Sequence, residues 1–169
     1  MADDPIVLAP PDPRWAALFA AERDAIAAAL APWLAGAPEH IGSTAVPGLP
    51  AKPVIDIMAP VVSLDASRAA IAAAASLQYA YVAYQADRMH WFCKPGPVNR
   101  THHLHLVPVG SALWRERLAF RDALRADTAL RDAYADLKRR LAAAHPQDRE
   151  AYTDAKGPFV AAVLAASLR

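Results

Sequence analysis

Apolar side chains near the start of the chain recur every three or four positions, which is the spacing of one face of an α-helix. The residues that follow this spacing are Trp15, Leu18, Phe19, Ile26 and Leu30. Asp12 is suited to the N-cap of such a helix and Pro13 to its first turn. Pro32 cannot continue the helical hydrogen bonding. We therefore predict a helix that begins after Asp12 and ends before Pro32.

The pattern changes over residues 39–58, where short apolar runs flank a loop rich in glycine and proline. This arrangement predicts a strand, a loop and a second strand. Residues 63–77 have helical spacing. Residues 79–84 and 89–93 resemble two paired strands on either side of a polar turn, and residues 104–107 predict a further strand.

Helical spacing returns after Gly110, with Ser111 as the expected N-cap. The apolar positions of this part are Leu113, Trp114, Leu118, Leu130, Tyr134, Leu137, Leu141, Tyr152, Phe159, Val160, Val163 and Leu164. The run from Lys138 to Arg140 is expected to form a solvated helix face. The sequence thus predicts an α+β fold over one domain, residues 1–169, with a mixed sheet in the middle, helices on its flanks and a helical C-terminal region.

Composition argues against several classes of function, namely nucleic-acid binding, membrane insertion and secretion. The chain has 169 residues and a formal net charge of +1, which argues against bulk DNA or RNA as the main partner. The alanine-rich stretches are interrupted before they reach the length of a membrane span. The single cysteine excludes an internal disulfide, and the N-terminus lacks the pattern of a secretory signal, so we expect a cytoplasmic protein.

Candidate chemistry lies in the loop that begins at Gly42. Glycine followed by Ser43 lets the backbone approach a ligand closely and presents amide groups and a hydroxyl, an arrangement that suits phosphate. The strand after the loop carries Asp56 within an apolar run, where a carboxylate needs a partner or a cation. An ordinary turn and an aspartate that caps backbone amides would explain the same residues.

The segment from His40 to Ile57 resembles the signature of the GrpB family, also called UPF0157. Later motifs resemble that family as well: Arg100 to Val107, Gly110 and Ser111 with Trp114, Phe120 to Asp122 with Leu124 and Arg125, Tyr134 with Leu137 and Lys138, and Tyr152 with Lys156 and Phe159. The family is placed by resemblance in the polymerase-β-like nucleotidyltransferase superfamily, which implies a nucleotidyltransferase-like mixed sheet. A related domain is fused to dephospho-CoA kinase in some bacteria, which implies the alternative of a non-catalytic ligand-binding or folding accessory domain.

The resemblance implies that Gly42, Ser43 and Thr44 hold phosphate and that Asp56 and Ser43 take part in catalysis. Enzymes of that superfamily use two carboxylates two residues apart to bind metal, but here the second position is Met58. His103 and His105 lie two apart on a predicted strand and therefore share a face. With Asp56 they could bind a divalent metal such as Zn²⁺, Mn²⁺ or Mg²⁺. Alternatively, one histidine hydrogen-bonds Asp56 and the other lines a dry pocket.

Lys52, Arg100 and Lys156 are the basic residues expected to neutralise phosphate. The sequence therefore predicts binding of a small phosphorylated ligand, with a nucleotide as the first candidate. Metal-assisted nucleotidyl or phosphoryl transfer would be the associated activity. Whether the chain is an enzyme, and which oligomer it forms, does not follow from the sequence.

Overall fold

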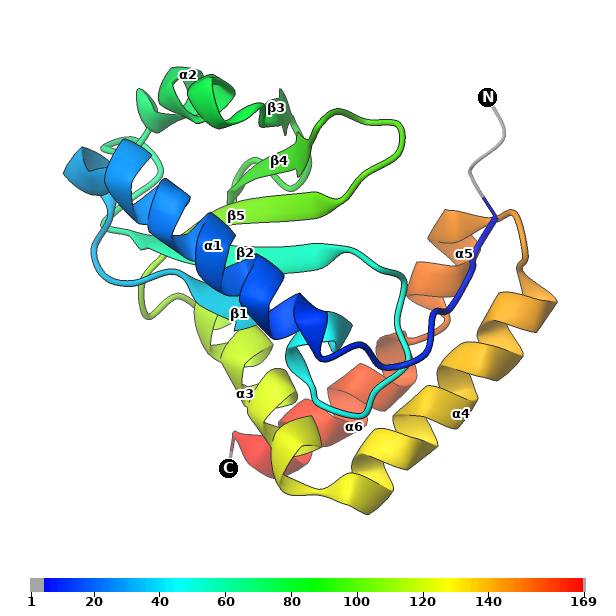
Figure 1. Ribbon diagram of the computed structural model, residues 1–169. Helices are drawn as coiled ribbons and strands as arrows, with labels where there is room; N and C mark the ends of the chain where they lie inside the picture. Colours follow the sequence, from blue (N-terminus) through cyan, green and yellow to red (C-terminus); the bar gives the residue numbers. More distant parts are fainter. Residues whose placement is uncertain (1–4, 169) are drawn as a thin grey trace.

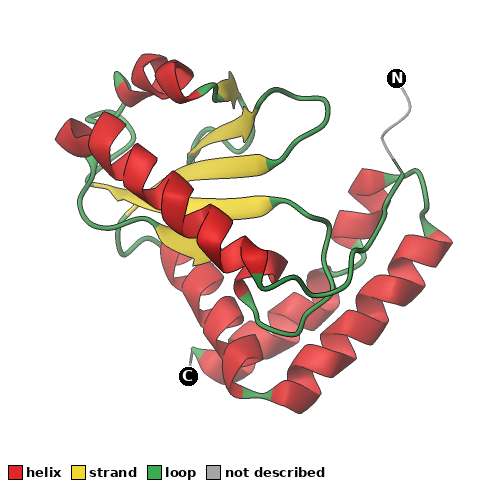
Figure 2. Ribbon diagram, viewed as in Figure 1, coloured by secondary structure: helices red, strands yellow, loops and turns green. Residues whose placement is uncertain are grey.

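A mixed sheet of five strands lies at the centre of the computed structural model, which describes residues 5–168 (Figures 1 and 2). The strands are β1 (Glu39–Ile41), β2 (Ile55–Val61), β3 (Ala80–Val82), β4 (His90–Lys94) and β5 (His102–Pro108). Their order across the sheet is β1-β2-β5-β4-β3. β2 and β5 run parallel, and the other neighbours are antiparallel. The predicted α+β class with a mixed sheet is confirmed.

Helices cover both faces of the sheet and build the C-terminal region. They are α1 (Arg14–Ala29), α2 (Ala70–Ala74), α3 (Ala112–Ala126), α4 (Thr128–Ala144), α5 (Arg149–Asp154) and α6 (Gly157–Ser167), with short 3₁₀ turns η1 (Ala31–Trp33), η2 (Ser43–Ala45) and η3 (Ala75–Leu77). In Figure 1, α1 crosses one face of the sheet, while α4, α5 and α6 lie beside the end at which β2 and β5 begin. Ser111 caps α3 as expected, because its Oγ accepts a hydrogen bond from the amide of Trp114 at 3.3 Å.

The two faces of β2 and β5 have different partners because successive side chains point to opposite sides of a strand. On the α1 face, buried Ile57 and Leu104 belong to an apolar core that includes Trp15 and Ile26. On the other face a separate cluster packs under α3; it comprises Ile41, Met58, Met89, Trp91, Cys93, Val107 and Leu113. A third cluster packs Val46 and Leu49 of the loop after β1 against the C-terminal helices; its buried helical members are Leu124, Tyr134 and Ala135.

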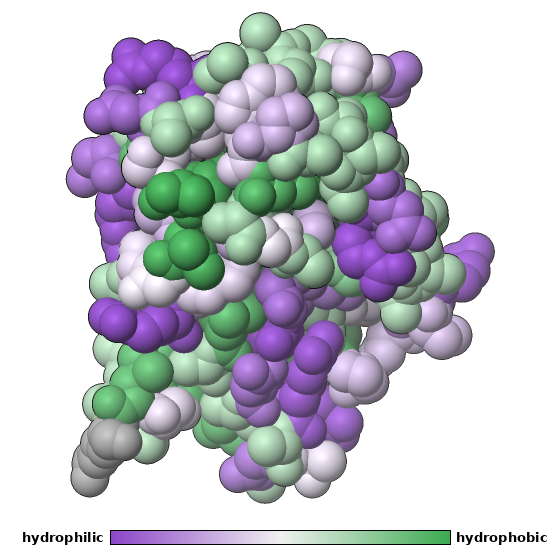
Figure 3. Space-filling model, turned by 90° about the vertical axis from the view of Figure 1, so that its left-hand side faces the viewer, coloured by the Kyte–Doolittle hydropathy of each residue, from purple (hydrophilic) through white to green (hydrophobic). Residues whose placement is uncertain are grey.

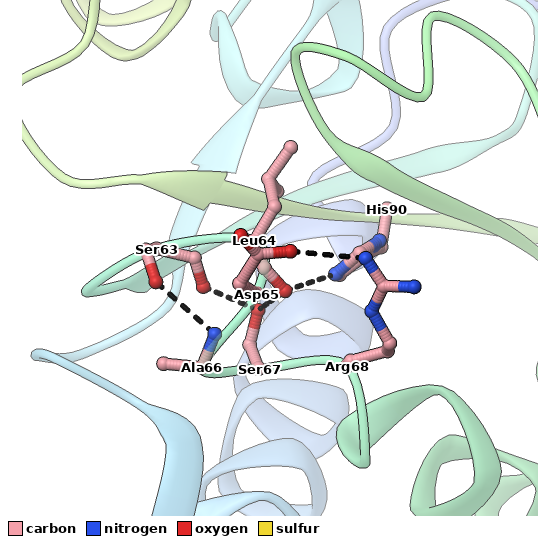
Figure 4. Close-up of polar contacts among 7 residues, drawn as sticks. All are labelled: Ser63, Leu64, Asp65, Ala66, Ser67, Arg68 and His90. Atoms are coloured by element: carbon pink, nitrogen blue, oxygen red, sulfur yellow. Dashed lines mark hydrogen bonds and ion pairs between the residues drawn. The ribbon is translucent and has the colours of Figure 1, made fainter.

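The helix predicted over residues 63–77 is wrong for the first part of that range. Turns occupy this part, and the helix α2 begins only at Ala70. Figure 4 shows the cause: Ser63 Oγ accepts from the amide of Ala66 at 3.1 Å, and Ser67 Oγ donates to the Ser63 carbonyl at 2.8 Å. Such local bonds from serine compete with helical pairing. His90 on β4 also contacts the Leu64 carbonyl at 3.0 Å and ties this segment to the sheet.

Apolar and hydrophilic side chains alternate on the side of the molecule shown in Figure 3, where the apolar surface forms small patches. Val62 and Val109 are exposed beyond the C-terminal ends of β2 and β5, at the opposite end from Asp56. Among residues 5–168, every helix is too short or too polar to cross a lipid bilayer.

Candidate functional site

Strand register brings the predicted carboxylate and histidines together. In the parallel pair of β2 and β5, Asp56 lies opposite His103 and Met58 lies opposite His105. All four side chains therefore point to the α3 face of the sheet. Asp56 Oδ1 lies 2.9 Å from His103 Nδ1 and 3.5 Å from His105 Nε2. The strand that carries the histidines therefore pairs directly with the strand that carries Asp56.

Gly42 packs directly against this carboxylate. Its φ of +73° is a conformation that glycine adopts without strain, and a Cβ atom built there would lie 2.7 Å from Asp56 Oδ2. The positive φ turns the chain from β1 into η2, so that Ser43 follows at the edge of the site. Glycine is required here for both conformation and space.

Burial and hydrogen bonding act in opposite directions on the acidic group. Burial raises the pKa of Asp56, but the hydrogen bonds and charges of His103 and His105 outweigh it and hold the pKa well below its usual range. Burial lowers the pKa of His105, although Asp56 opposes this effect. Asp56 is therefore an anion at neutral pH, and His105 favours the neutral imidazole.

A cavity of about 110 Å³ lies beside Asp56 and is lined largely by polar groups. Its lining residues are Ser43, Thr44, Ala51, Lys52, Val54, Asp56, Lys138, Tyr152 and Lys156. The ammonium groups of Lys52 and Lys156 lie 5.3 and 4.3 Å from the centre of the Tyr152 ring. Among the described residues, the lining of this cavity therefore contains three lysines and one carboxylate, that of Asp56.

Lys138 corrects the prediction of a solvated face on α4. Its side chain is 2% exposed, and its Nζ donates to Ser43 Oγ at 2.9 Å and to the Pro50 carbonyl. The signal was present in the sequence, because Lys138 lies four residues after Tyr134 and three before Leu141 and so falls on the apolar stripe of the helix. Arg139 and Arg140 are exposed as expected.

Two lysines of the cavity, Lys138 and Lys156, have lowered pKa values. Burial, followed by the nearby charges of Lys156 and Arg139, lowers the pKa of Lys138 to about 7. Burial and the charge of Lys52 lower the pKa of Lys156 to about 8, while Asp56 opposes the shift. Cations held close together in a partly dry site gain stability from an anion between them.

The loop between β1 and β2 is held in place by basic side chains of the helical region. Arg125 on α3 donates to the Ala45 carbonyl at 2.8 Å. Arg131 on α4 donates to the Pro47 carbonyl at 3.3 Å, and Lys138 donates to Pro50. We refer to these three contacts as the carbonyl anchors. They fix the position of Ser43 relative to α4.

Two residues predicted to bind phosphate, Arg100 and Thr44, instead contact other groups of the protein. Arg100 lies outside the lining of the cavity; its guanidinium stands 5.3 Å from the centre of the Trp91 ring, and its Nε donates to the Pro97 carbonyl at 2.8 Å. Thr44 lines the cavity, but its Oγ1 already bonds the Val54 carbonyl and contacts His40 Nε2. Ser43, Lys52 and Lys156 are therefore the predicted side chains that the structure brings together around the cavity.

Thr44 also lines a larger hollow of about 400 Å³ near the start of α1. That hollow is mostly apolar, and its polar side chains are engaged: His40 contacts Thr44, and Arg125 donates to Ala45. Burial lowers the pKa of His40 to about 4, so this group is neutral at physiological pH. The small lysine-lined cavity is the better candidate for chemistry.

Asp56, His103 and His105 also pass a geometric test for a metal site. Each offers a ligand atom, and these atoms lie within 4.8 Å of one another. Among the described residues, the buried Nε2 atom of His103 has no hydrogen-bond partner, and that of His105 has only the 3.5 Å contact with Asp56. Imidazole nitrogens with one carboxylate suit Zn²⁺ or Mn²⁺, whereas the buried thioether of Met58 is a poor ligand for Mg²⁺. The contact from His103 to Asp56 equally matches the simpler interpretation of a hydrogen-bonded pair.

Comparisons with known proteins agree with the resemblance seen in the sequence. The family model described as GrpB protein matches residues 5–166. A UPF0157 protein of Pseudomonas aeruginosa is 42% identical over 98% of this chain and 69% of its own length, and one of Deinococcus radiodurans is 40% identical over 91% and 78%. The crystal structure of conserved protein GrpB from Enterococcus faecalis has a TM-score of 0.86 and 30% identity, covering 96% of this chain and 97% of that one. The chain therefore belongs to the GrpB family.

Proposed function

We propose that the protein binds a small phosphorylated molecule, with a nucleotide as the first candidate, in the cavity beside Asp56. The observation that carries the proposal is the convergence of Lys52, Lys138 and Lys156 on one cavity with a single carboxylate in its described lining. A phosphate there would replace repulsion between the ammonium groups of Lys52 and Lys156 with charge-assisted hydrogen bonds. The cavity has the volume of roughly three or four water molecules, which suits one phosphoryl group with the rest of the ligand outside.

Asp56, His103 and His105 would hold a divalent ion, Zn²⁺ or Mn²⁺, next to this phosphate. Such an ion supplies Lewis-acid polarisation of a phosphoryl oxygen when bound. The chain's own groups would bind and orient the phosphate: Lys156 and Lys52 by charge, and Ser43 by its hydroxyl. Nucleotidyl or phosphoryl transfer is the activity that this arrangement would support.

A non-catalytic binding domain is the second candidate function, and Met58 favours it. This residue is fully buried and occupies the position where the resembled enzymes carry a second metal-binding carboxylate. The two candidates differ in turnover. Incubation with nucleoside triphosphates and Mg²⁺, Mn²⁺ or Zn²⁺, followed by chromatography, should give product only if transfer occurs, and only with Asp56 intact.

Binding is tested by thermal shift and calorimetry with inorganic phosphate, pyrophosphate and nucleotides. Lys156→Ala should weaken the best ligand by about ten- to a hundredfold, because a charge-assisted contact contributes about 1.5–3 kcal/mol. Arg140→Ala is the matched control, since Arg140 is exposed on α4, and it should change affinity less than twofold. The proposal fails if no phosphorylated compound stabilises the protein, or if both variants weaken binding equally.

A further inference from the structure

We propose that Ser43 and Lys138 form a nucleophile–base pair that takes up a phosphoryl group from the bound ligand on Ser43 Oγ. This inference rests on the proposed function for the presence of a phosphorylated ligand. It adds a covalent step, which neither binding nor direct transfer between substrates requires.

The geometry of the pair is that of an activated hydroxyl. Lys138 Nζ lies 2.9 Å from Ser43 Oγ, within the distance at which a base takes a proton. Lys138 is buried and anchored to the Pro50 carbonyl, so its amine has a fixed direction. Ser43 and Lys138 both line the cavity in which the phosphate is proposed to lie.

The second contact of the amine leaves its lone pair available when the amine is neutral. A neutral lysine amine has two N–H groups and one lone pair, so an N–H donates to Pro50 while the lone pair accepts the serine proton. In the protonated form, Nζ donates to Ser43 Oγ and to Pro50 and lies 5.2 Å from the centre of the Tyr134 ring. The Ser43 hydroxyl would then serve only as an acceptor.

The charged and titratable groups around Lys138 also favour its neutral form. Lys156, where α5 meets α6, and Arg139, its neighbour on α4, repel an additional proton, and burial adds to this effect. Tyr134 on α4 and Tyr152 on α5 stay neutral because burial raises the pKa of both phenols, that of Tyr152 to about 12. Asp56 and Lys52 complete the ionisable lining of the cavity.

The step balances as follows. Ser43 Oγ attacks phosphorus, the new O–P bond forms, the P–O bond to the leaving alcohol breaks, and the serine proton passes to Lys138 Nζ. The leaving oxygen takes a proton from solvent. Attack of water on the phosphoserine then releases inorganic phosphate and a proton, and Lys138 returns its proton to Ser43.

The test uses diisopropyl fluorophosphate, an uncharged phosphorus electrophile that needs no lysine cluster to bind it. The reaction forms a Ser43 Oγ–P bond and expels fluoride. Mass spectrometry of the digested full-length protein should find the adduct on Ser43. Lys138→Arg keeps a cation and donors but stays protonated, so labelling should slow by about 100-fold. Arg140→Ala should label at the wild-type rate.

The labelling rate of the wild-type protein provides a second measurement that needs no variant to fold. The rate should rise with pH and level off above pH about 7, where the pKa of Lys138 lies. An unlabelled Ser43, equal labelling in Lys138→Arg, or a rate that rises steadily to pH 10 would overturn the pair. If these tests fail but phosphate still raises the melting temperature, the binding proposal stands without the covalent step. If phosphate does not raise the melting temperature either, both proposals are wrong.

Discussion

The two faces of the central sheet use the same strands for different purposes. On the α1 face, Ile57 and Leu104 are fully buried in a continuous apolar core. On the opposite face, Asp56 and His103 of the same two strands form a polar pair next to a cavity. Because strand side chains alternate, a shift of one residue in register would exchange these two sets. The α1 face therefore serves packing alone, whereas the opposite face combines the apolar cluster under α3 with the polar groups of the proposed site.

The largest effect on stability is expected from a substitution in the apolar face of the sheet. Leu104→Ala should lower the free energy of unfolding by about 2–5 kcal/mol, because it removes buried methyl groups and leaves a cavity. Urea denaturation measures this loss. Val62→Ala, at a side chain that is 74% exposed, should change stability by less than about 0.5 kcal/mol. Similar losses in both variants would contradict the assignment of the core.

Low pH should destabilise the fold through His40, a polar residue on the apolar face of the sheet. His40 stacks on Phe19 of α1, and burial lowers its pKa to about 4. The folded state thus binds fewer protons than the unfolded state, so stability falls as pH decreases from about 6.5 toward 4. The loss at pH 4 is roughly 3 kcal/mol from this group.

His40→Gln removes this titration. The difference in unfolding free energy between pH 7 and pH 4 should therefore be smaller in the variant by that amount. His145→Gln, at a half-exposed position, is the control. An unchanged difference in His40→Gln would show that folding does not shift the pKa of His40.

Comparison of two glycines separates the effect of the Gly42–Asp56 contact from the effect of backbone strain. Gly42 and Gly110 share a φ of +73°, but a Cβ at Gly110 meets nothing within 4 Å, whereas a Cβ at Gly42 would clash with Asp56. In both alanine variants the strained backbone should lower the free energy of unfolding by about 1 kcal/mol or more. Gly42→Ala should cost about 1–3 kcal/mol in total and also weaken phosphate binding; equal costs without a binding defect would remove Gly42 from the site.

The smallest effect is a change of affinity with pH. As pH rises from 7 to 9, Lys156 loses most of its positive charge, since its pKa lies at about 8. Affinity for inorganic phosphate should fall by about tenfold over this range. Calorimetry measures the fall, and Lys156→Arg should reduce it because arginine stays charged. A constant affinity would place the phosphate elsewhere.

Period-two alternation predicted part of the site. It placed His103 and His105 on one face, and the apolar run around Asp56 indicated a strand; the pairing of these two strands is seen only in the structure. Lys138 was missed because a run of three basic residues is usually solvated. Helical spacing, which puts Lys138 on the stripe of Tyr134, was the stronger signal.

Other differences arise from local bonds that pattern alone does not reveal. Serine hydroxyls turned the first part of the segment 63–77 away from helix, although its apolar spacing is helical. Arg100 was expected at the phosphate, but the Trp91 ring and the Pro97 carbonyl hold it outside the cavity lining. Hydrophobic spacing does not register such bonds, because the serine hydroxyls and the Arg100 guanidinium pair with backbone carbonyls or amides three or four residues away.

The carbonyl anchors have a consequence for the order of folding. The bonds from Arg125, Arg131 and Lys138 to the loop join residues 80, 84 and 88 positions apart. Contacts of such long range carry a large loop-closure entropy and form only after the intervening chain is ordered. The hairpin of β3 and β4 needs no such closure. The lysine cavity should therefore be completed late, when the α3–α4 pair docks, and a chain that has formed its sheet would still lack the site.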